Sequence, residues 1–123
     1  MNLLKISTLS LILASTAVAA DDCVNPGAPT MPDGASSTME QMIAGQKEVK
    51  TFQAANIEYM DCLAARFAAA EAQSTEGSDD EKAAAKEIYD TSVDAYNAAV
   101  SAEEQVAGSF NTEIRAYKAA NPK

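Results

Sequence analysis

The chain has 123 residues, a formal net charge of −9, no histidine and two cysteines. A chain of this length forms one small domain, because a second hydrophobic core needs more residues. The excess of acidic residues, 18 against 9 basic ones, argues against nucleic acid or anionic membrane surfaces as partners. The lack of histidine removes the commonest general base and the commonest metal ligand.

Residues 1–20 have the three parts of an export signal. Lys5 precedes an apolar run over residues 6–13, and residues 17–20 read Ala-Val-Ala-Ala, a small-residue site for signal peptidase. The apolar run contains Ser and Thr and is too short to cross ~30 Å of hydrocarbon. We expect residues 1–20 to be a signal peptide and the mature chain to start near Asp21. That chain would lie in the periplasm or be secreted, with no membrane insertion after signal removal.

Cys23 and Cys62 are the only cysteines of the sequence. Export to an oxidising compartment predicts a disulfide between them. Closing a loop of about forty residues stabilises a fold by roughly 4 kcal/mol in the chain-entropy model. A redox-active or metal-binding pair is less favoured, because the spacing is not C-x-x-C and the chain has no histidine.

The segment over residues 21–37 is predicted to be extended rather than helical. It contains Pro26, Pro29 and Pro32. This spacing matches the three-residue turn of polyproline II, so the three rings fall on one edge, which can pack on apolar surface. The alternative interpretation is a P-x-x-P ligand for an SH3-like domain, but no such domain is expected outside a cytoplasm to bind it.

Two long helices are predicted over residues 38–73 and 79–120. Apolar residues recur at steps of three and four through both segments, as on the buried face of a helix. A polar break with Gly77 separates them, and Asn121 before a proline ends the second. We expect an all-α fold, an antiparallel coiled-coil-like two-helix hairpin over residues 38–123, because a short connection places long helices side by side. The disulfide would staple the Pro-rich extended segment to the first helix.

Local patterns predict where the helices start and which positions form their seam. Ser37 with Glu40, and Ser78 with Glu81, have the form of capping boxes. On the first helix the predicted seam positions are Met42, Val49, Phe52, Asn56, Tyr59, Leu63 and Ala70. On the second helix they are Tyr89, Val93, Tyr96, Val100, Glu103, Ala107, Phe110, Ile114 and Tyr117.

A turn centred near Glu76 sets the register of the predicted pair. In this register Asn56 faces Tyr96, and Gly45 faces Ala107. We expect the helices to come closest at Gly45, Ala107 and Gly108, where small residues oppose each other.

Polar residues on or beside the seam are the candidate site residues. Glu103 occupies a core-type position, and Lys47 and Lys50 on the facing turn are candidates to pair with it. Asn56 faces Tyr96, whose hydroxyl would satisfy the Asn56 amide. A buried Asn of this kind can fix helix register. We interpret these residues as determinants of structural specificity, and a ligand pocket built around them is the alternative.

The residue types for catalysis are largely missing from the sequence. It has no histidine, no free thiol once the disulfide forms and no G-x-S-x-G motif. Its carboxylates lack the spacing of a calcium loop and read as solvated or helix-capping groups. We therefore expect a protein that is not an enzyme, with no cofactor and no metal site.

Alanine-rich helix faces suggest a second copy as one possible partner. Two such faces packed together would give a four-helix bundle and enlarge a small core. The alanines concerned are Ala64, Ala65, Ala68, Ala69, Ala95, Ala98, Ala99 and Ala102.

A pattern over residues 23–63 resembles a group of small, uncharacterised exported helical proteins of Gram-negative bacteria. The pattern is C-x2-P-x2-P-x2-P-D-G followed by Y-x2-C-L, and its residues are Cys23, Pro26, Pro29, Pro32, Asp33, Gly34, Met39, Met42, Val49, Phe52, Tyr59, Cys62 and Leu63. The resemblance implies a periplasmic setting and the Cys23–Cys62 disulfide. It implies no catalytic or binding residue.

From these observations we expect an envelope interaction factor or a stress-associated factor that acts by protein contact. Its partner would be an unknown protein or a second copy of the chain. One alternative is a carrier of a small apolar or cationic ligand, with a cavity near Gly45, Ala107 and Gly108. The other is an acid-responsive periplasmic chaperone, suggested by the isoelectric point of about 4.3.

Overall fold

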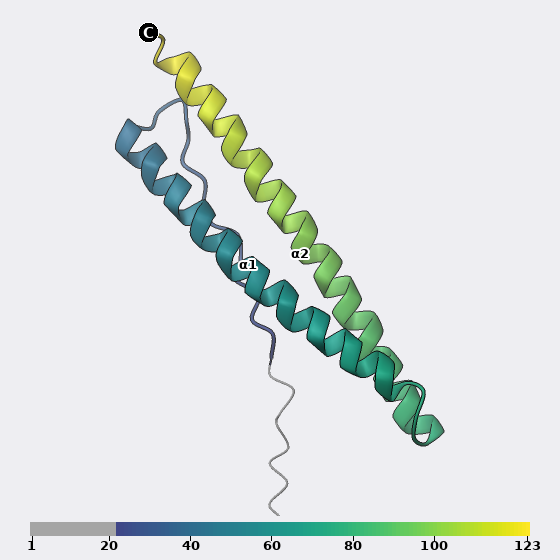
Figure 1. The fold of residues 1–123 in the computed structure, drawn as a ribbon. Coiled ribbons are helices and arrows are strands. Elements are labelled where there is room, and N and C mark those ends of the chain that lie inside the picture. The colour runs from purple at the N-terminus through teal and green to yellow at the C-terminus, as the bar shows by residue number, and fades with distance from the viewer. Residues whose placement is uncertain (1–21) are drawn as a thin grey trace, which may run out of the picture.

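The computed structural model describes residues 22–123, which form two long antiparallel helices and an extended N-terminal segment (Figure 1). Helix α1 spans Met39–Gln73 and helix α2 spans Asp79–Ala120, and no strand occurs between residues 22 and 123. The predicted all-α hairpin is therefore confirmed. The expected signal peptide, residues 1–20, lies outside the described residues.

Helix α1 begins one residue later than the sequence pattern indicated. Thr38, and not Ser37, is the N-cap: its hydroxyl accepts from the Gln41 N–H at 3.2 Å, and its own N–H donates to the Gln41 side chain at 2.7 Å. The prediction was wrong because Ser37 belongs to the preceding turn. The N–H groups of Ser36 and Ser37 donate to the Asp33 carbonyl at 3.2 and 2.9 Å.

Helix α2 begins with the predicted capping box. The Ser78 N–H donates to the Glu81 carboxylate at 2.8 Å, and the Glu81 N–H donates to the Ser78 hydroxyl at 3.3 Å. Gly77 precedes the cap with a φ of 97°, a left-handed conformation that favours glycine. This turn reverses the chain and makes the helices antiparallel.

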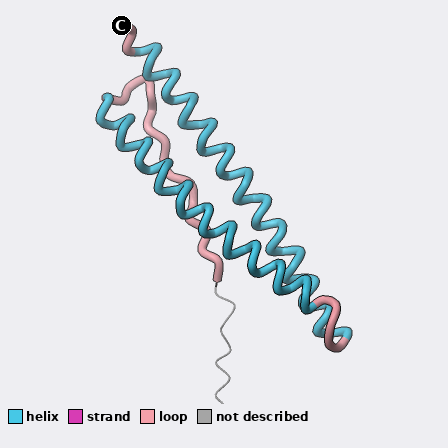
Figure 2. Tube along the Cα trace, in the orientation of Figure 1, coloured by secondary structure: helices cyan, strands magenta, loops and turns pink. Residues whose placement is uncertain are grey.

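The N-terminal segment forms a third, non-helical layer, called here the ribbon (residues 22–37). Pro26, Pro29 and Pro32 are half-buried, while the residues between Pro26 and Pro29 are exposed, as expected for rings on one edge. Figure 2 shows the ribbon running alongside both helices. Met31 packs on the buried cluster formed by Met42, Val49, Phe52, Val106 and Phe110.

Two glycines let the ribbon approach the helices closely. Pro32 lies over Gly45, where an added Cβ would stand 2.7 Å from the proline ring. The Gly34 N–H donates to the Glu113 carboxylate at 2.7 Å, and a Cβ on Gly34 would stand 1.9 Å from the Glu113 carbonyl oxygen. The ribbon thus contacts both helices at the end of the hairpin away from the turn.

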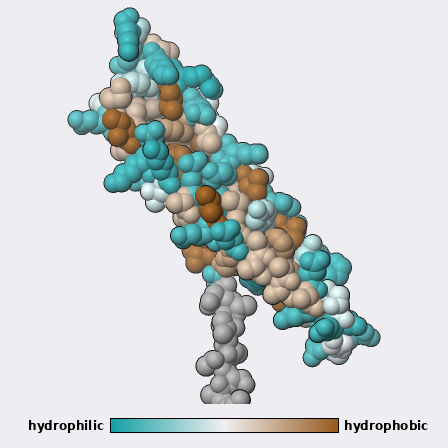
Figure 3. Space-filling model, viewed as in Figure 1, coloured by the Kyte–Doolittle hydropathy of each residue, from teal (hydrophilic) through white to brown (hydrophobic). Residues whose placement is uncertain are grey.

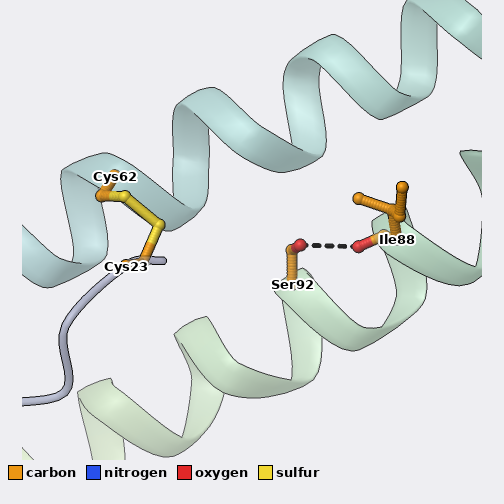
Figure 4. Close-up of a disulfide and its surroundings, with 4 residues drawn as sticks. All are labelled: Cys23, Cys62, Ile88 and Ser92. Carbon is orange, nitrogen blue, oxygen red and sulfur yellow. Dashed lines mark hydrogen bonds between the residues drawn. A yellow bond between two sulfur atoms is a disulfide. The ribbon is translucent and has the colours of Figure 1, made fainter. Parts of the chain in front are cut away.

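The predicted disulfide between Cys23 and Cys62 is confirmed, with Cα atoms 5.6 Å apart (Figure 4). It ties the start of the ribbon to α1. On α2, Ser92 is buried and its hydroxyl donates to the Ile88 carbonyl at 2.6 Å. That internal hydrogen bond satisfies a polar group at the helix contact.

The contact face of α2 differs from the predicted seam. The buried positions are Ala85, Ser92, Ala99, Val106 and Phe110. The predicted seam residues Val93, Val100 and Ala107 each lie one position after a buried residue, about 100° further round the helix. Val100 is 37% exposed. The small side chains of Ala85, Ser92 and Ala99 allow the helix axes to come closer than valine would, because interaxial distance follows the side chains at the contact.

The register also differs, by about one helical turn. Asn56 contacts Ala99 and Glu103 rather than facing Tyr96. Side chains on a helix lean toward its N-terminus. In an antiparallel pair this lean carries each α1 side chain toward a position further along α2, which the symmetric count from the turn ignored.

Candidate functional site

Asn56 is a buried polar residue on α1 that forms hydrogen bonds across the helix contact to α2. It is 1% exposed, and its Nδ2 donates to the Ala99 carbonyl at 3.0 Å and to Glu103 Oε2 at 3.2 Å. Glu103 itself is half-buried. The amide therefore has partners on α2, and the contact fixes how α1 sits along α2.

The other three polar candidates lie elsewhere. Tyr96 packs edge-to-face on Phe67, with ring centroids 5.9 Å apart, instead of pairing with Asn56. Lys47 and Lys50 are exposed, and the ion pair present within residues 22–123 joins Lys86 and Asp90 instead. The predicted pairing of the two lysines with Glu103 is replaced by the Asn56 contact.

The Lys86–Asp90 pair lies on the surface of α2, four residues apart. The hydrogen bond that the Lys86 ammonium donates to the Asp90 carboxylate, and the charge of that carboxylate, raise the pKa of Lys86. Both side chains are largely exposed, so this pair adds little to the stability of the fold.

Within residues 22–123 the polar candidate residues are not grouped into a metal-binding cluster. In residues 22–123 no group of three or more His, Cys, Asp or Glu side chains is placed to hold a metal ion. No helix in the same stretch has the length and apolar character needed to cross a membrane.

Gly45 and Gly108, where a cavity was expected, do not face each other across the helix contact. Pro32 covers Gly45, and an added Cβ at Gly108 would meet nothing within 4 Å. Gly108 faces outward because it lies two positions after Val106 on α2, away from the helix contact.

A mainly apolar surface, interrupted by charged residues, lies on the side of the hairpin opposite the ribbon. The helix contacts repeat every seven residues, through Asn56 on α1 and Ala99 on α2. The residues that follow each contact residue by one position lie about 100° further round the helix and form a column on this side. We call the two columns together the open face: Ile43, Lys50, Ile57, Ala64 and Glu71 on α1, and Lys86, Val93, Val100, Ala107 and Ile114 on α2.

The ribbon covers the other side of the hairpin. Cys62, which holds the ribbon, lies six positions after Asn56 and so about 120° round α1 in the opposite sense to Ile57. The ribbon therefore leaves the open face uncovered.

Large hydrophobic residues are exposed on this open side. Residues 22–123 contain five such residues. Three belong to the open face, Ile43 at 58% exposed, Ile57 at 54% and Val100 at 37%, and Met39, 56% exposed, lies beside it one helical turn before Ile43. The fifth is Val24, on the ribbon. The surface view in Figure 3 likewise shows apolar residues at several points along the molecule, among hydrophilic ones.

A groove of about 580 Å³ lies at the end of the open face where α1 begins and α2 ends. Its walls are mainly apolar, with Lys118 and Lys123 among the lining residues. The apolar lining residues are Met39, Met42, Ile43, Phe110, Ile114 and Tyr117. A volume of this size suits a small apolar molecule or an apolar side-chain cluster.

The sequence contained a pattern for the open face, but the prediction assigned its residues to the helix contact. Val93, Val100 and Ala107 are apolar residues spaced seven apart. A single apolar column and two adjacent ones give the same heptad pattern, so the pattern alone did not separate the helix contact from the surface beside it.

The fold and these surfaces define a small, disulfide-stapled helical hairpin with one covered and one open side. Comparison of the chain with protein-family models, curated proteins and solved structures finds no match.

Proposed function

We propose that this protein is a non-enzymatic contact protein of the bacterial envelope and that the open face is its binding surface. The observation that carries the proposal is the exposure of Met39, Ile43, Ile57 and Val100 on one side of the hairpin. Exposed apolar residues that gather on one face, rimmed by charges, are typical of protein interaction sites. The disulfide supports an oxidising compartment, in keeping with a periplasmic location.

Site-specific photo-crosslinking tests this proposal in the producing cell. A photo-reactive amino acid replaces Ile57 or Val100 on the open face, and Val24 serves as the matched control because it is apolar, exposed and on the ribbon. We expect protein adducts from positions 57 and 100 and none from position 24. Adducts from all three positions alike, or from none, contradict the proposal.

The groove favours a second candidate function, the binding of a small apolar ligand. Met39, Met42 and Phe110 supply flexible and aromatic walls that adapt to apolar shapes. A fluorescent apolar probe such as a naphthalene dye tests it by titration. A probe that binds wild type and loses affinity about tenfold in Ile43→Lys supports the groove. Equal affinity for both proteins contradicts it.

A further inference from the structure

Charges on the flanks of the open face are complementary between α1 and α2. Contacts within the hairpin give the level of each position, since Asn56 lies beside Ala99 and Gly45 beside Phe110. By the same spacing Lys50 is level with Glu104. Both residues are exposed, and both lie on the open side of their helices.

A similar relation holds toward the turn. Glu71 lies within two residues of the level of Lys86, and both side chains are exposed. Lys86 also pairs with Asp90 on its own helix. Toward the turn the signs therefore run basic then acidic along α1, and acidic then basic at the same levels along α2. Within one chain these charges sit on opposite flanks of the face, on helices whose contact residues separate them.

We propose that the open face binds a second copy of this chain, related by a two-fold axis parallel to the helices. The two hairpins then form a four-helix bundle in which α1 of each copy lies beside α2 of the other, with the ribbons outside. This inference rests on the proposed function, because it names the partner of the same surface. In this arrangement Lys50 faces Glu104 of the second copy and Glu71 faces Lys86, and symmetry repeats each pair.

An axis across the helices would place α1 against α1 with the ends exchanged. Lys50 would then lie against α1 of the second copy instead of Glu104. Only the parallel axis lets a charge change at Lys50 compensate one at Glu104.

The apolar residues match in the same arrangement. Ile57 lies within two residues of the level of Val100 of the second copy, and Ile43 within two residues of the level of Ile114. The face is also large enough: α1 is ~52 Å long at 1.5 Å per residue, and two packed helices are about 18 Å wide. The resulting area, on the order of 900 Å², meets the roughly 800 Å² that each partner buries in a stable interface.

Charge reversal in two separate variants tests the arrangement. Lys50→Glu sets two carboxylates against each other at each symmetry-related pair, and Glu104→Lys sets two ammonium groups against each other there. In a one-to-one mixture each mixed dimer regains opposite charges at both pairs. Arg115→Glu is the control, since Arg115 is exposed on the outer side of α2 and the substitution changes the charge equally. Circular dichroism verifies that all variants remain helical.

The measurement is analytical ultracentrifugation of the exported, oxidised protein at about 0.15 M salt. We expect a wild-type dimer at 100 micromolar protein, about tenfold weaker association for each single variant, and recovery to within about threefold in the mixture, as for two exposed ion pairs with reversed sign. Arg115→Glu should match wild type. A monomeric wild type, or a mixture no tighter than the single variants, overturns the second-copy inference. The proposed function fails separately, when positions 57 and 100 give no crosslink to any protein.

Discussion

The contact of Asn56 with α2 should be the most sensitive polar interaction in the hairpin. Asn56→Ala removes the donor to the Ala99 carbonyl at 3.0 Å and to the Glu103 carboxylate at 3.2 Å. A neutral hydrogen bond contributes about 1 kcal/mol net and one to a charged group about 1.5–3 kcal/mol. The Ala99 carbonyl lies within a helix, and Glu103 is half-buried and reaches water, so neither is left wholly unsatisfied. We expect a loss of about 2–3 kcal/mol.

Urea unfolding of the oxidised protein, followed by circular dichroism, measures this loss. Asn97→Ala is the matched control, because Asn97 is exposed on α2 and alanine is the better helix former. A double-mutant cycle with Glu103→Ala isolates the side-chain pair and should give a coupling of about 1 kcal/mol. An Asn56→Ala protein within about 0.5 kcal/mol of wild type would refute the view that this contact fixes the helix register.

Two further predictions concern the ribbon. Gly34→Ala should destabilise the protein by about 2–3 kcal/mol or release the ribbon, because the new methyl group would overlap the Glu113 carbonyl. Gly108→Ala, the matched control in open space within α2, should stabilise it by about 0.8–1 kcal/mol through helix propensity. Equal effects in urea unfolding would contradict the placement of the ribbon. Reduction of the disulfide should lower stability by roughly 4 kcal/mol while helices persist at low urea, and an unchanged unfolding midpoint would show that the staple contributes nothing.

Local patterns in the sequence were sufficient to predict the elements and their staple. The second helix start at Ser78 and Glu81 depends on hydrogen bonds within four residues, and the structure has them. The half-buried Pro26, Pro29 and Pro32 follow from a three-residue period. These features depend on interactions between residues close together in the sequence, so local sequence patterns predict them.

To predict the candidate site, one must know which of two neighbouring residue columns on α2 forms the contact with α1. Val100 and Ala99 are adjacent in sequence, and hydrophobicity favours valine for burial. The structure buries alanine, because a small side chain permits close helix packing and the lean of side chains shifts the register. Packing between the two helices decides which column is buried, and the hydrophobic pattern of one helix does not predict this packing. The Asn56 contact with Glu103 was missed for the same reason.

The helix contact combines small side chains with a cluster of larger ones, Met42, Val49, Phe52, Val106 and Phe110. Ala70, Ala85, Ser92 and Ala99 are also buried, whereas the larger Ile43, Ile57 and Val100 are exposed. A fold stable alone gains most by burying the larger groups, since free energy follows the apolar area removed from water. The ribbon does not correct this distribution, because the disulfide holds it on the other side of α1. A partner on the open face would correct it, and the proposed second copy would place Glu104 opposite Lys50 at its flank.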